Sequence, residues 1–462
     1  MKYIGPFLRI NVLDNENIKN QLFHLSKEAI ANIVLSSGCG IICPKENLKG
    51  KYLPLSEDSI NHGNAPLLAL YRKASSKLIN LNSELKWNDK KFKKEINIAS
   101  NAYMTLCLLE LVDYYNKFVD IDDDKYALKN YYLELAGEQL EFYAQNCRSP
   151  EGVFIDKTLN TDSNSNDIKL YDKDGKFRFS TQAIFMACYY KYSSYNKLNE
   201  KNEFKEFALD ILNMLIDFKE DISKLSQDEL TRICFGLNIF YKYSNNEDAE
   251  KLLLDLSELM LENLKYMPVA ILKDNLSTTC LIYINCMILY KHTKLEKFKD
   301  NSIKAFEAII DLYEDDKDIF LKNSNDKECK LCCDEVMLYL YSIMLHNDIE
   351  KEEGKNCDNS IVHNIYKNEI LSSGLILSWP DAPNLDDVER YRNFSNNSED
   401  LLQDEHFKMG SLPTPENNSI APVFSKYIVY SRKKDCFKSS KNTFDSYKNM
   451  LIFFIILFMR NI

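Results

Sequence analysis

Apolar residues follow two patterns that alternate along the chain. In the first pattern they cover almost every side of an expected helix, in segments near 179–190, 231–241, 276–290 and 333–345. In the second they form one stripe, in segments near 202–218, 247–264 and 295–313. A helix that is apolar on all sides must be enclosed, whereas a striped helix covers other elements and keeps one wet face. The alternation therefore predicts an inner and an outer layer of helices.

Local spacing supports these helices. In 202–218 the side chains three or four residues apart fall on one helix face, namely Phe204, Phe207, Ile211, Leu215 and Phe218. Three pairs near expected starts have the spacing of a capping box: Ser226 with Glu229, Ser244 with Glu247, and Thr293 with Glu296. Further helices are expected near 98–118, 125–147 and 361–371.

The connections differ in length according to their direction. Links from an enclosed helix to the next striped helix are short, and links from a striped helix to the next enclosed one are longer, above all 148–178 and 314–329. Antiparallel neighbours place all links of one type at the same end. We therefore expect one plain end and one end with long loops, where binding and catalytic groups tend to lie.

Composition favours an all-α protein. The 462 residues include only 12 glycines and 11 prolines, which suits long helices better than many tight turns. The net charge of −11 and the lack of a basic face argue against a nucleic-acid partner. Most of the 13 cysteines lie inside apolar helical runs, so we expect reduced thiols and a cytoplasmic protein.

Residues 450–459 form an uninterrupted apolar run between basic residues. A bilayer span needs about 20 such residues, so this run is too short to cross a membrane. We expect a buried terminal helix, with a peripheral membrane contact as the alternative.

The chain before residue 96 is less regular. We expect an extended stretch at 3–12, a helix near 18–35 and another at 66–81. This division predicts an N-terminal extension, residues 1–95, packed on a helical domain of residues 96–462. The helical domain includes a long loop at 372–425 and the C-terminal apolar helix.

An inner ring inside an outer ring, built from helical hairpins, resembles the (α/α)6 toroid of the six-hairpin glycosidase-like superfamily. The resemblance rests on helix order over 97–371, with a last helix near Met450, and on the Gly152-Val153-Phe154 stretch after an outer helix. It implies hydrolase, lyase or epimerase chemistry on sugars, and the fold alone does not choose among these.

Two loops at the long-loop end contain candidate site residues. If the protein is an enzyme, we expect Asp381 and Asp156 to act as an acid and base pair, since glycoside chemistry needs two carboxyl groups. Trp379 and Tyr391 would be sugar platforms and Arg390 an anion contact. The alternative for Trp379 and Asp381 is structural: the indole packs over the ring and the carboxylate caps a turn.

Carboxylates at the starts of the enclosed helices are a second possibility, namely Glu229, Asp334 and Glu335. Negative residues in a first turn are also favourable for dipole reasons alone, so capping is the competing interpretation. Neither a metal site nor a cofactor is expected, because Cys329, Cys332 and Cys333 have no matching second pair and no phosphate-binding loop occurs.

The sequence therefore predicts an all-α, (α/α)6-type toroid that binds a carbohydrate or a similar polar ligand. The alternatives are a non-catalytic helical-repeat scaffold for a protein partner and a peripheral membrane protein. A toroid brings its first and last hairpins together, whereas an open solenoid leaves a long concave surface.

Overall fold

A computed structural model describes residues 15–44, 66–81, 84–159, 169–195, 202–322, 326–381, 387–389, 414–438 and 442–460. The stretch expected at 3–12 lies outside the described residues.

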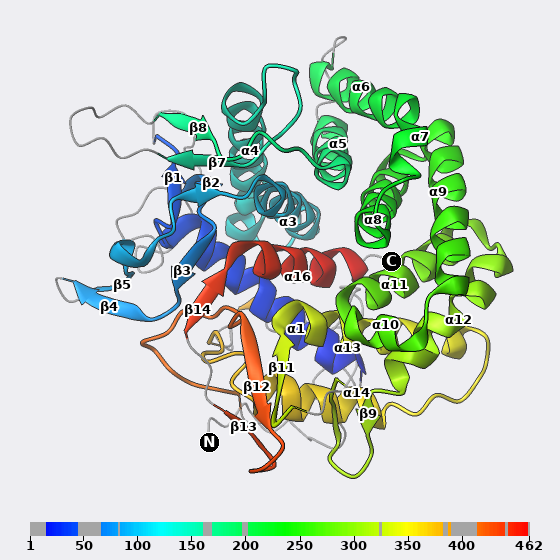
Figure 1. Ribbon diagram of the computed structural model, residues 1–462. Coiled ribbons are helices and arrows are strands. Elements are labelled where there is room, and N and C mark those ends of the chain that lie inside the picture. Colours follow the sequence, from blue (N-terminus) through cyan, green and yellow to red (C-terminus); the bar gives the residue numbers. More distant parts are fainter. Residues whose placement is uncertain are drawn as a thin grey trace.

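Long helices form a closed inner ring (Figure 1). Its members, in the described part of the chain, are α3 (Ile98–Asn116), α5 (Phe179–Ser194), α8 (Gln227–Ser244), α11 (Leu276–Thr293), α13 (Cys333–Glu352) and α16 (Ser446–Met459). Each packs against the next, and α16 packs against both α13 and α3. The last inner helix therefore closes the ring, as a toroid requires and an open solenoid does not.

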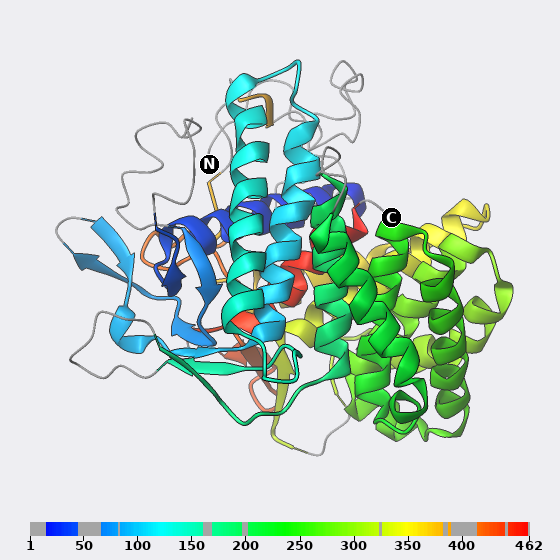
Figure 2. The same cartoon turned by 90° about the horizontal axis from the view of Figure 1, so that it is seen from above.

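A second set of helices surrounds this ring. It consists of α4 (Asp123–Asn146), α6 (Glu203–Asp217), α9 (Glu247–Tyr266), α12 (Glu296–Ile310), α14 (Ser360–Ile365) with the π-helix η3 (Tyr366–Leu371), and α1 (Asn15–Ala31) with the π-helix η1 (Asn32–Ser36). Each of the first five packs on the inner helix that precedes it, and α1 packs on α16. Figure 2 shows one such pair, α3 and α4, side by side. The first outer helix thus completes a hairpin with the last inner one.

The burial of the two sets matches the two sequence patterns. In α11 almost every residue from Thr279 to Leu289 is buried, whereas in α6 only Ala208, Ile211, Leu212 and Leu215 are buried. The predicted inner and outer layers are confirmed. A helix in the ring has neighbours on all sides, so its sequence has no stripe.

Short antiparallel strands occupy the connections and no β-layer lies at the centre of the described structure. They are β1 (Gly40–Ile42), β2 (Leu67–Leu70), β3 (Lys73–Ser75), β4 (Leu78–Leu81), β5 (Glu84–Trp87), β6 (Glu95–Ile96), β7 (Lys157–Leu159), β8 (Leu170–Asp172), β9 (Tyr313–Glu314), β10 (Ile319–Phe320), β11 (Glu328–Cys332), β12 (Tyr427–Ser431), β13 (Cys436–Lys438) and β14 (Thr443–Asp445). The remaining short helices are the 3-10 helix η2 (Asp89–Lys91), α7 (Lys219–Ile222) and α10 (Val269–Asp274).

The helix predicted at 66–81 is wrong. The segment forms β2, β3 and β4, which pair with β1, β14 and β5. All of Leu67–Leu70 is buried, and a short run buried on both faces does not show whether it is a strand or a buried helix. Long-range pairing with β1 decides in favour of the strand.

Of the three predicted capping boxes, two are wrong and only the Ser226 half of the third forms, because the Glu229 carboxylate accepts from another helix. Asn246, not Ser244, caps α9, and α12 begins after Leu295 with no side-chain cap. Ser226 does cap α8. Hydroxyl and carboxyl residues three apart are common near helix starts, so the spacing alone did not fix the first helical residue.

The apolar run at 450–459 lies in α16, and every residue from Met450 to Phe458 is buried. The predicted buried terminal helix is confirmed. In the described part of the chain, no helix combines the length and the apolar character that crossing a membrane requires. All thirteen cysteine thiols are free, as expected.

A charge placed inside the ring should prevent folding. Ile288 of α11 is fully buried, so Ile288→Asp should cost more than about 4 kcal/mol of unfolding free energy, because the carboxylate has no partner there. Ile271→Asp is the matched control, since Ile271 is 41% exposed. Circular dichroism during urea denaturation measures both. Cooperative unfolding of Ile288→Asp at the wild-type midpoint would contradict the enclosed position of α11.

Candidate functional site

The inner helices all start at the same end of the ring, where the long connections gather. Polar side chains of their first turns are joined by hydrogen bonds: Ser446 Oγ donates to Ser100 Oγ (3.1 Å), and Arg232 Nη1 donates to the Tyr447 hydroxyl (2.5 Å). Thr278 Oγ1 donates to Asp228 (2.8 Å). We call this end the mouth. The mouth cluster comprises Tyr103, Arg178, Asp228, Glu229, Arg232, Thr278, Asp334, Tyr447 and Lys448.

Asp228 is the most connected acid of the mouth cluster. Arg232, one turn later on α8, donates from Nε to both of its carboxylate oxygens (3.1 and 3.0 Å), and Thr278 adds a third hydrogen bond. Burial raises the pKa of Asp228, but these bonds and the nearby charges of Arg232 and Arg178 outweigh burial and lower the pKa. The side chain is still 48% exposed, so an ionised carboxylate faces the mouth.

Glu229 has a different structural role from the one expected. Its backbone N–H donates to Ser226 Oγ (3.4 Å), which confirms Ser226 as N-cap. Its carboxylate accepts instead from the Ser180 N–H (3.0 Å), in the first turn of α5. Glu229 therefore links two neighbouring inner helices.

Two more carboxylates at inner-helix starts are paired with lysines. Asp334 of α13 accepts from Lys448 Nζ of α16. Glu335 accepts from Lys322 Nζ and from the Cys332 N–H (2.8 Å), closing a capping box that the sequence analysis did not predict. Both carboxylates are thus engaged in holding helix starts in place.

Arg178 is the cation of the mouth cluster with the most freedom to meet a ligand. It precedes α5, is exposed, and its guanidinium forms no hydrogen bond or ion pair in the described structure. Its charge still acts on Asp228 and Tyr447. An exposed guanidinium and an ionised carboxylate offer both donors and acceptors at this end of the ring.

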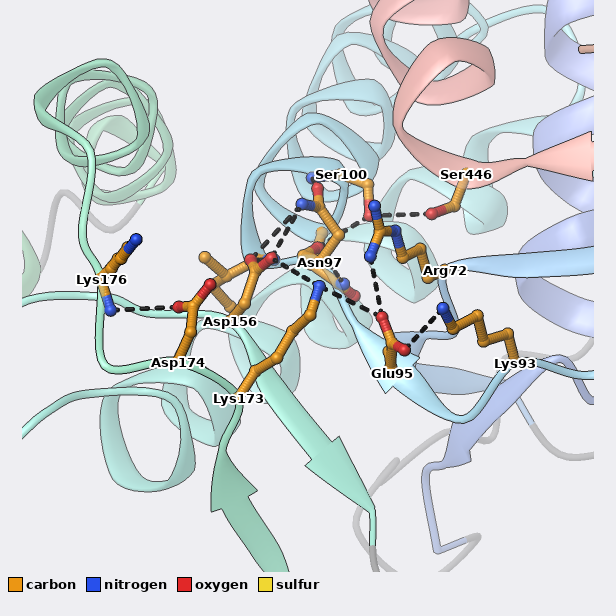
Figure 3. Close-up of polar contacts among 12 residues, drawn as sticks. Arg72, Lys93, Glu95, Asn97, Ser100, Asp156, Lys173, Asp174, Lys176 and Ser446 are labelled. Carbon is orange, nitrogen blue, oxygen red and sulfur yellow. Dashed lines mark hydrogen bonds and ion pairs between the residues drawn. The ribbon is translucent and has the colours of Figure 1, made fainter.

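Asp156 also lies at this end, in the network of Figure 3. Its carboxylate accepts from the Ile98 N–H (2.9 Å) and from Asn97 Nδ2 (3.2 Å), at the start of α3. Lys173 lies 4.0 Å from it and bridges to Glu95 at 3.1 Å. One quarter of the Asp156 side chain is exposed.

The structure does not bring Asp381 to the mouth. The Asp381 carbonyl contacts His24 Nε2 (2.9 Å) on α1, and the neighbouring Phe23 ring packs on Tyr114, near the end of α3 (4.8 Å). Asp156 contacts the first residue of α3. At 1.5 Å of rise per residue, the two positions are about 24 Å apart along α3.

Asp156 and Asp381 are therefore too far apart to flank one glycosidic bond, which needs carboxyl groups within about 10 Å. The Trp379 side chain is half-buried against the core, and the Trp379 backbone N–H donates to the Pro415 carbonyl (2.7 Å). Arg390 and Tyr391 lie outside the described residues. Of the two candidate loops, the loop before α5 lies at the expected end, whereas Asp381 and Glu389, in the described part of the loop after η3, contact α1.

Sequence reasoning missed the centre of the site, Asp228, Arg232 and Tyr447. A signal was present: an acid and a base four residues apart interrupt the start of a helix that is otherwise apolar all round. Such a pair inside an enclosed helix must meet either a partner or an opening. No group of three or more metal-ligating side chains occurs in the described ranges.

No protein-family model and no curated protein sequence matches the chain. Among solved structures, D-mannose isomerase superposes with a TM-score of 0.51 at 8% identity, over 97% of this chain and 100% of that chain. The chain has the (α/α)6 toroid fold. The resemblance to the six-hairpin superfamily is thus confirmed at the level of fold.

Two other matches superpose less closely. Cellobiose 2-epimerase from Bacillus thermoamylovorans has a TM-score of 0.48 at 9% identity, over 85% of this chain and 93% of that chain. The GH76 alpha-mannanase of Bacteroides thetaiotaomicron has a TM-score of 0.45 at 9% identity, over 97% and 98%.

The carboxylate of Glu95 beside Asp156 should make stability depend on pH. Burial raises the pKa of Glu95, but hydrogen bonds from Lys93, Arg72 and Lys173 outweigh it and lower the pKa to about 2. A lowered folded-state pKa stabilises above the unfolded-state pKa, and the stabilisation is lost as pH falls through the folded-state value. Glu95→Gln should therefore lower the unfolding free energy by roughly 2 kcal/mol at neutral pH and by progressively less below pH 4.5.

Urea denaturation at a series of pH values measures this difference. Glu141→Gln is the control, because Glu141 is exposed on the outer helix α4. A loss in Glu95→Gln that stays constant down to pH 2.5 would contradict the ionic role of this carboxylate.

Proposed function

We propose that this protein binds and chemically modifies a carbohydrate at the mouth of the toroid. The observation that carries the proposal is the mouth cluster itself: a set of ionised and hydroxyl side chains at the end of the ring where the inner helices begin. Asp228, Arg178 and Tyr447 offer acceptors and donors at this end of the ring. A sugar, with hydroxyls around its edge and apolar faces, requires this mixture.

The carboxylate geometry supports a particular assignment. Asp228 stays ionised at neutral pH and is about half exposed, so we assign it the role of base or of acceptor for a sugar hydroxyl. Asp156 lies at the same end and is retained as a second carboxyl group. The pairing of Asp156 with Asp381 is not retained, because the two lie at opposite ends of α3.

The mouth cluster supports a carbohydrate ligand more directly than it supports any one reaction on that ligand. Hydrolases, epimerases and isomerases of sugars occur among proteins that share this fold. An ionised carboxylate next to a guanidinium suits proton abstraction from a carbon or a hydroxyl as well as activation of water. We therefore propose sugar hydrolysis, elimination or epimerisation as the chemistry to be screened.

The two alternatives from sequence now have less support. The closed ring lacks the extended concave surface that a solenoid scaffold uses. The apolar run at 450–459, which motivated a peripheral membrane contact, is in the core. For location we retain the cytoplasm as a proposal, which the free thiols support.

Substitution of Asp228 tests the proposed site. Titration of wild-type protein with a panel of aldoses, ketoses and disaccharides, followed by saturation-transfer NMR, should identify a bound sugar. Asp228→Asn should weaken that binding at least tenfold, because a hydrogen bond to a charged group is worth about 1.5–3 kcal/mol. The same panel, followed by ¹H NMR over hours, detects turnover, which Asp228→Asn should abolish.

Asp248→Asn is the matched control, because Asp248 is exposed on the outer helix α9. It should leave both binding and turnover unchanged. If no sugar binds the wild-type protein, or if Asp228→Asn binds it as tightly, the mouth is not a carbohydrate site.

A further inference from the structure

A groove of about 560 Å³ lies along the strands β3 and β14, beside the start of α16. Figure 1 shows β3 next to β14, which leads directly into α16. We call it the lysine groove. Its polar lining consists of Lys73, Ser75, Lys77, Lys91, Asn442 and Thr443. None of the described residues that line it is a carboxylate.

Strand geometry places the lining residues of β3 on one side. Successive side chains of a strand point to opposite faces, and Ala74 and Ser76 are buried, whereas Lys73 and Ser75 are half-buried and Lys77 is exposed. The neighbouring strand β14 adds Thr443, which pairs with Ser75. The three side chains Lys73, Ser75 and Lys77 therefore form a row along the groove.

Lys91 reaches the groove from a separate segment, the 3-10 helix η2. The chain after η2 is fixed beside β3, because the Lys93 N–H donates to the Lys73 carbonyl (2.8 Å). Lys91 itself is exposed. Two segments thus bring three lysines to one groove.

These three lysines form no ion pair within the described ranges, because the neighbouring carboxylates are held by other cations. Glu95 pairs with Arg72 (2.8 Å) and with Lys93 (2.7 Å), as Figure 3 shows. Asp445, opposite Lys73 in the sheet, pairs with Lys426 (3.4 Å) and caps the start of α16.

The surroundings of the groove are also positively charged. Residues 72–94 contain eight basic and only two acidic residues, in a chain whose net charge is −11. Burial and the charge of Lys426 lower the pKa of Lys73, against the opposing effect of Asp445. The expected lack of a basic face holds for the chain as a whole and not for this segment. The groove therefore attracts an anion.

The shape of the row favours an extended anion with several charges. Lys73 and Lys77 are four residues apart, so their backbone positions are separated by about 13 Å at the rise of a strand. A single phosphate is much shorter than this row. Nucleic-acid-binding proteins neutralise more charges, about six to ten phosphates in a typical duplex site.

One end of the row lies at the mouth. Arg72, next to Lys73, accepts from the Ser446 N–H through its carbonyl (3.0 Å). The Ser446 hydroxyl in turn donates to Ser100, in the first turn of α3 (3.1 Å). A chain molecule lying on the row would therefore extend toward the end of the ring where we place sugar binding.

We propose that the lysine groove binds a negatively charged stretch of a polysaccharide, with carboxylate or sulfate groups along it. The acidic groups would lie on Lys73, Lys77 and Lys91, while the hydroxyls and amide of the lining would meet sugar hydroxyls. That the ligand is a sugar chain rests on the proposed function, whereas its negative charge rests on the groove alone.

Isothermal titration of the full chain with tetragalacturonate, a sugar with four carboxylates, tests the proposal. Wild-type protein should bind it, and should bind the neutral maltotetraose at least tenfold more weakly. The triple variant Lys73→Gln, Lys77→Gln, Lys91→Gln should weaken tetragalacturonate binding about tenfold, because each exposed ion contact contributes a factor of about two to five.

The triple variant Lys224→Gln, Lys251→Gln, Lys265→Gln is the matched control. It changes the net charge equally, and its lysines are 70%, 70% and 55% exposed outside the groove. It should bind tetragalacturonate like the wild-type protein. Circular dichroism of both variants checks that they are folded before binding is compared.

Four results would overturn the proposal: no binding of tetragalacturonate to wild-type protein, equal binding by the groove variant, equally tight binding of maltotetraose, or equally tight binding of a hexaglutamate peptide. Failure of the proposed function gives a different result. In that case the neutral sugars of the panel neither bind nor turn over, while tetragalacturonate still binds and the groove variant still loses it, which supports the groove.

Discussion

The whole architecture depends on the burial of α16 between α3 and α13. Each large apolar side chain from Met450 to Phe458 is buried and contributes roughly 1.5–3 kcal/mol when it leaves water. With α16 in place, every inner helix has two neighbours in the ring. Without it, the apolar walls of α3 and α13 would face solvent, and the ring would be an open arc.

Because the inner helices all run in the same direction, the two ends of the ring also differ in electrostatic character. At the mouth, the first turns of the inner helices contribute unpaired N–H groups and carry partial positive charge, so carboxylates such as Glu229 and Asp334 are stabilised there. At the other end, C-terminal turns favour cations such as Lys291 and Arg460. The direction of the helices thus accounts for the carboxylates at the starts of the inner helices and for the basic residues at the ends of α5, α8, α11 and α13.

The layering of the fold was predictable from sequence because burial on all sides leaves a strong compositional mark. The helices of both rings were predicted, most with ends within a few residues of those observed, although α13 continues to Glu352, well beyond the predicted end at 345. The strands β2 to β4 were missed because their pairing partners, β1, β14 and β5, include one that is more than 300 residues away. The site was predictable only in outline. The loop before α5 was assigned to the correct end, but the path of the chain after η3 depends on tertiary contacts with α1, and so Asp381 was placed incorrectly beside Asp156.

The position of α1 has a consequence for how the molecule is made. The first outer helix rests on the last inner helix, so a ribosome releases α1 long before its main partner α16 has been synthesised. Until then the apolar walls that will receive α16 are exposed, and such surfaces promote aggregation. A chain that stops before residue 446 would lack α16, so its other inner helices would have no partner with which to close the ring.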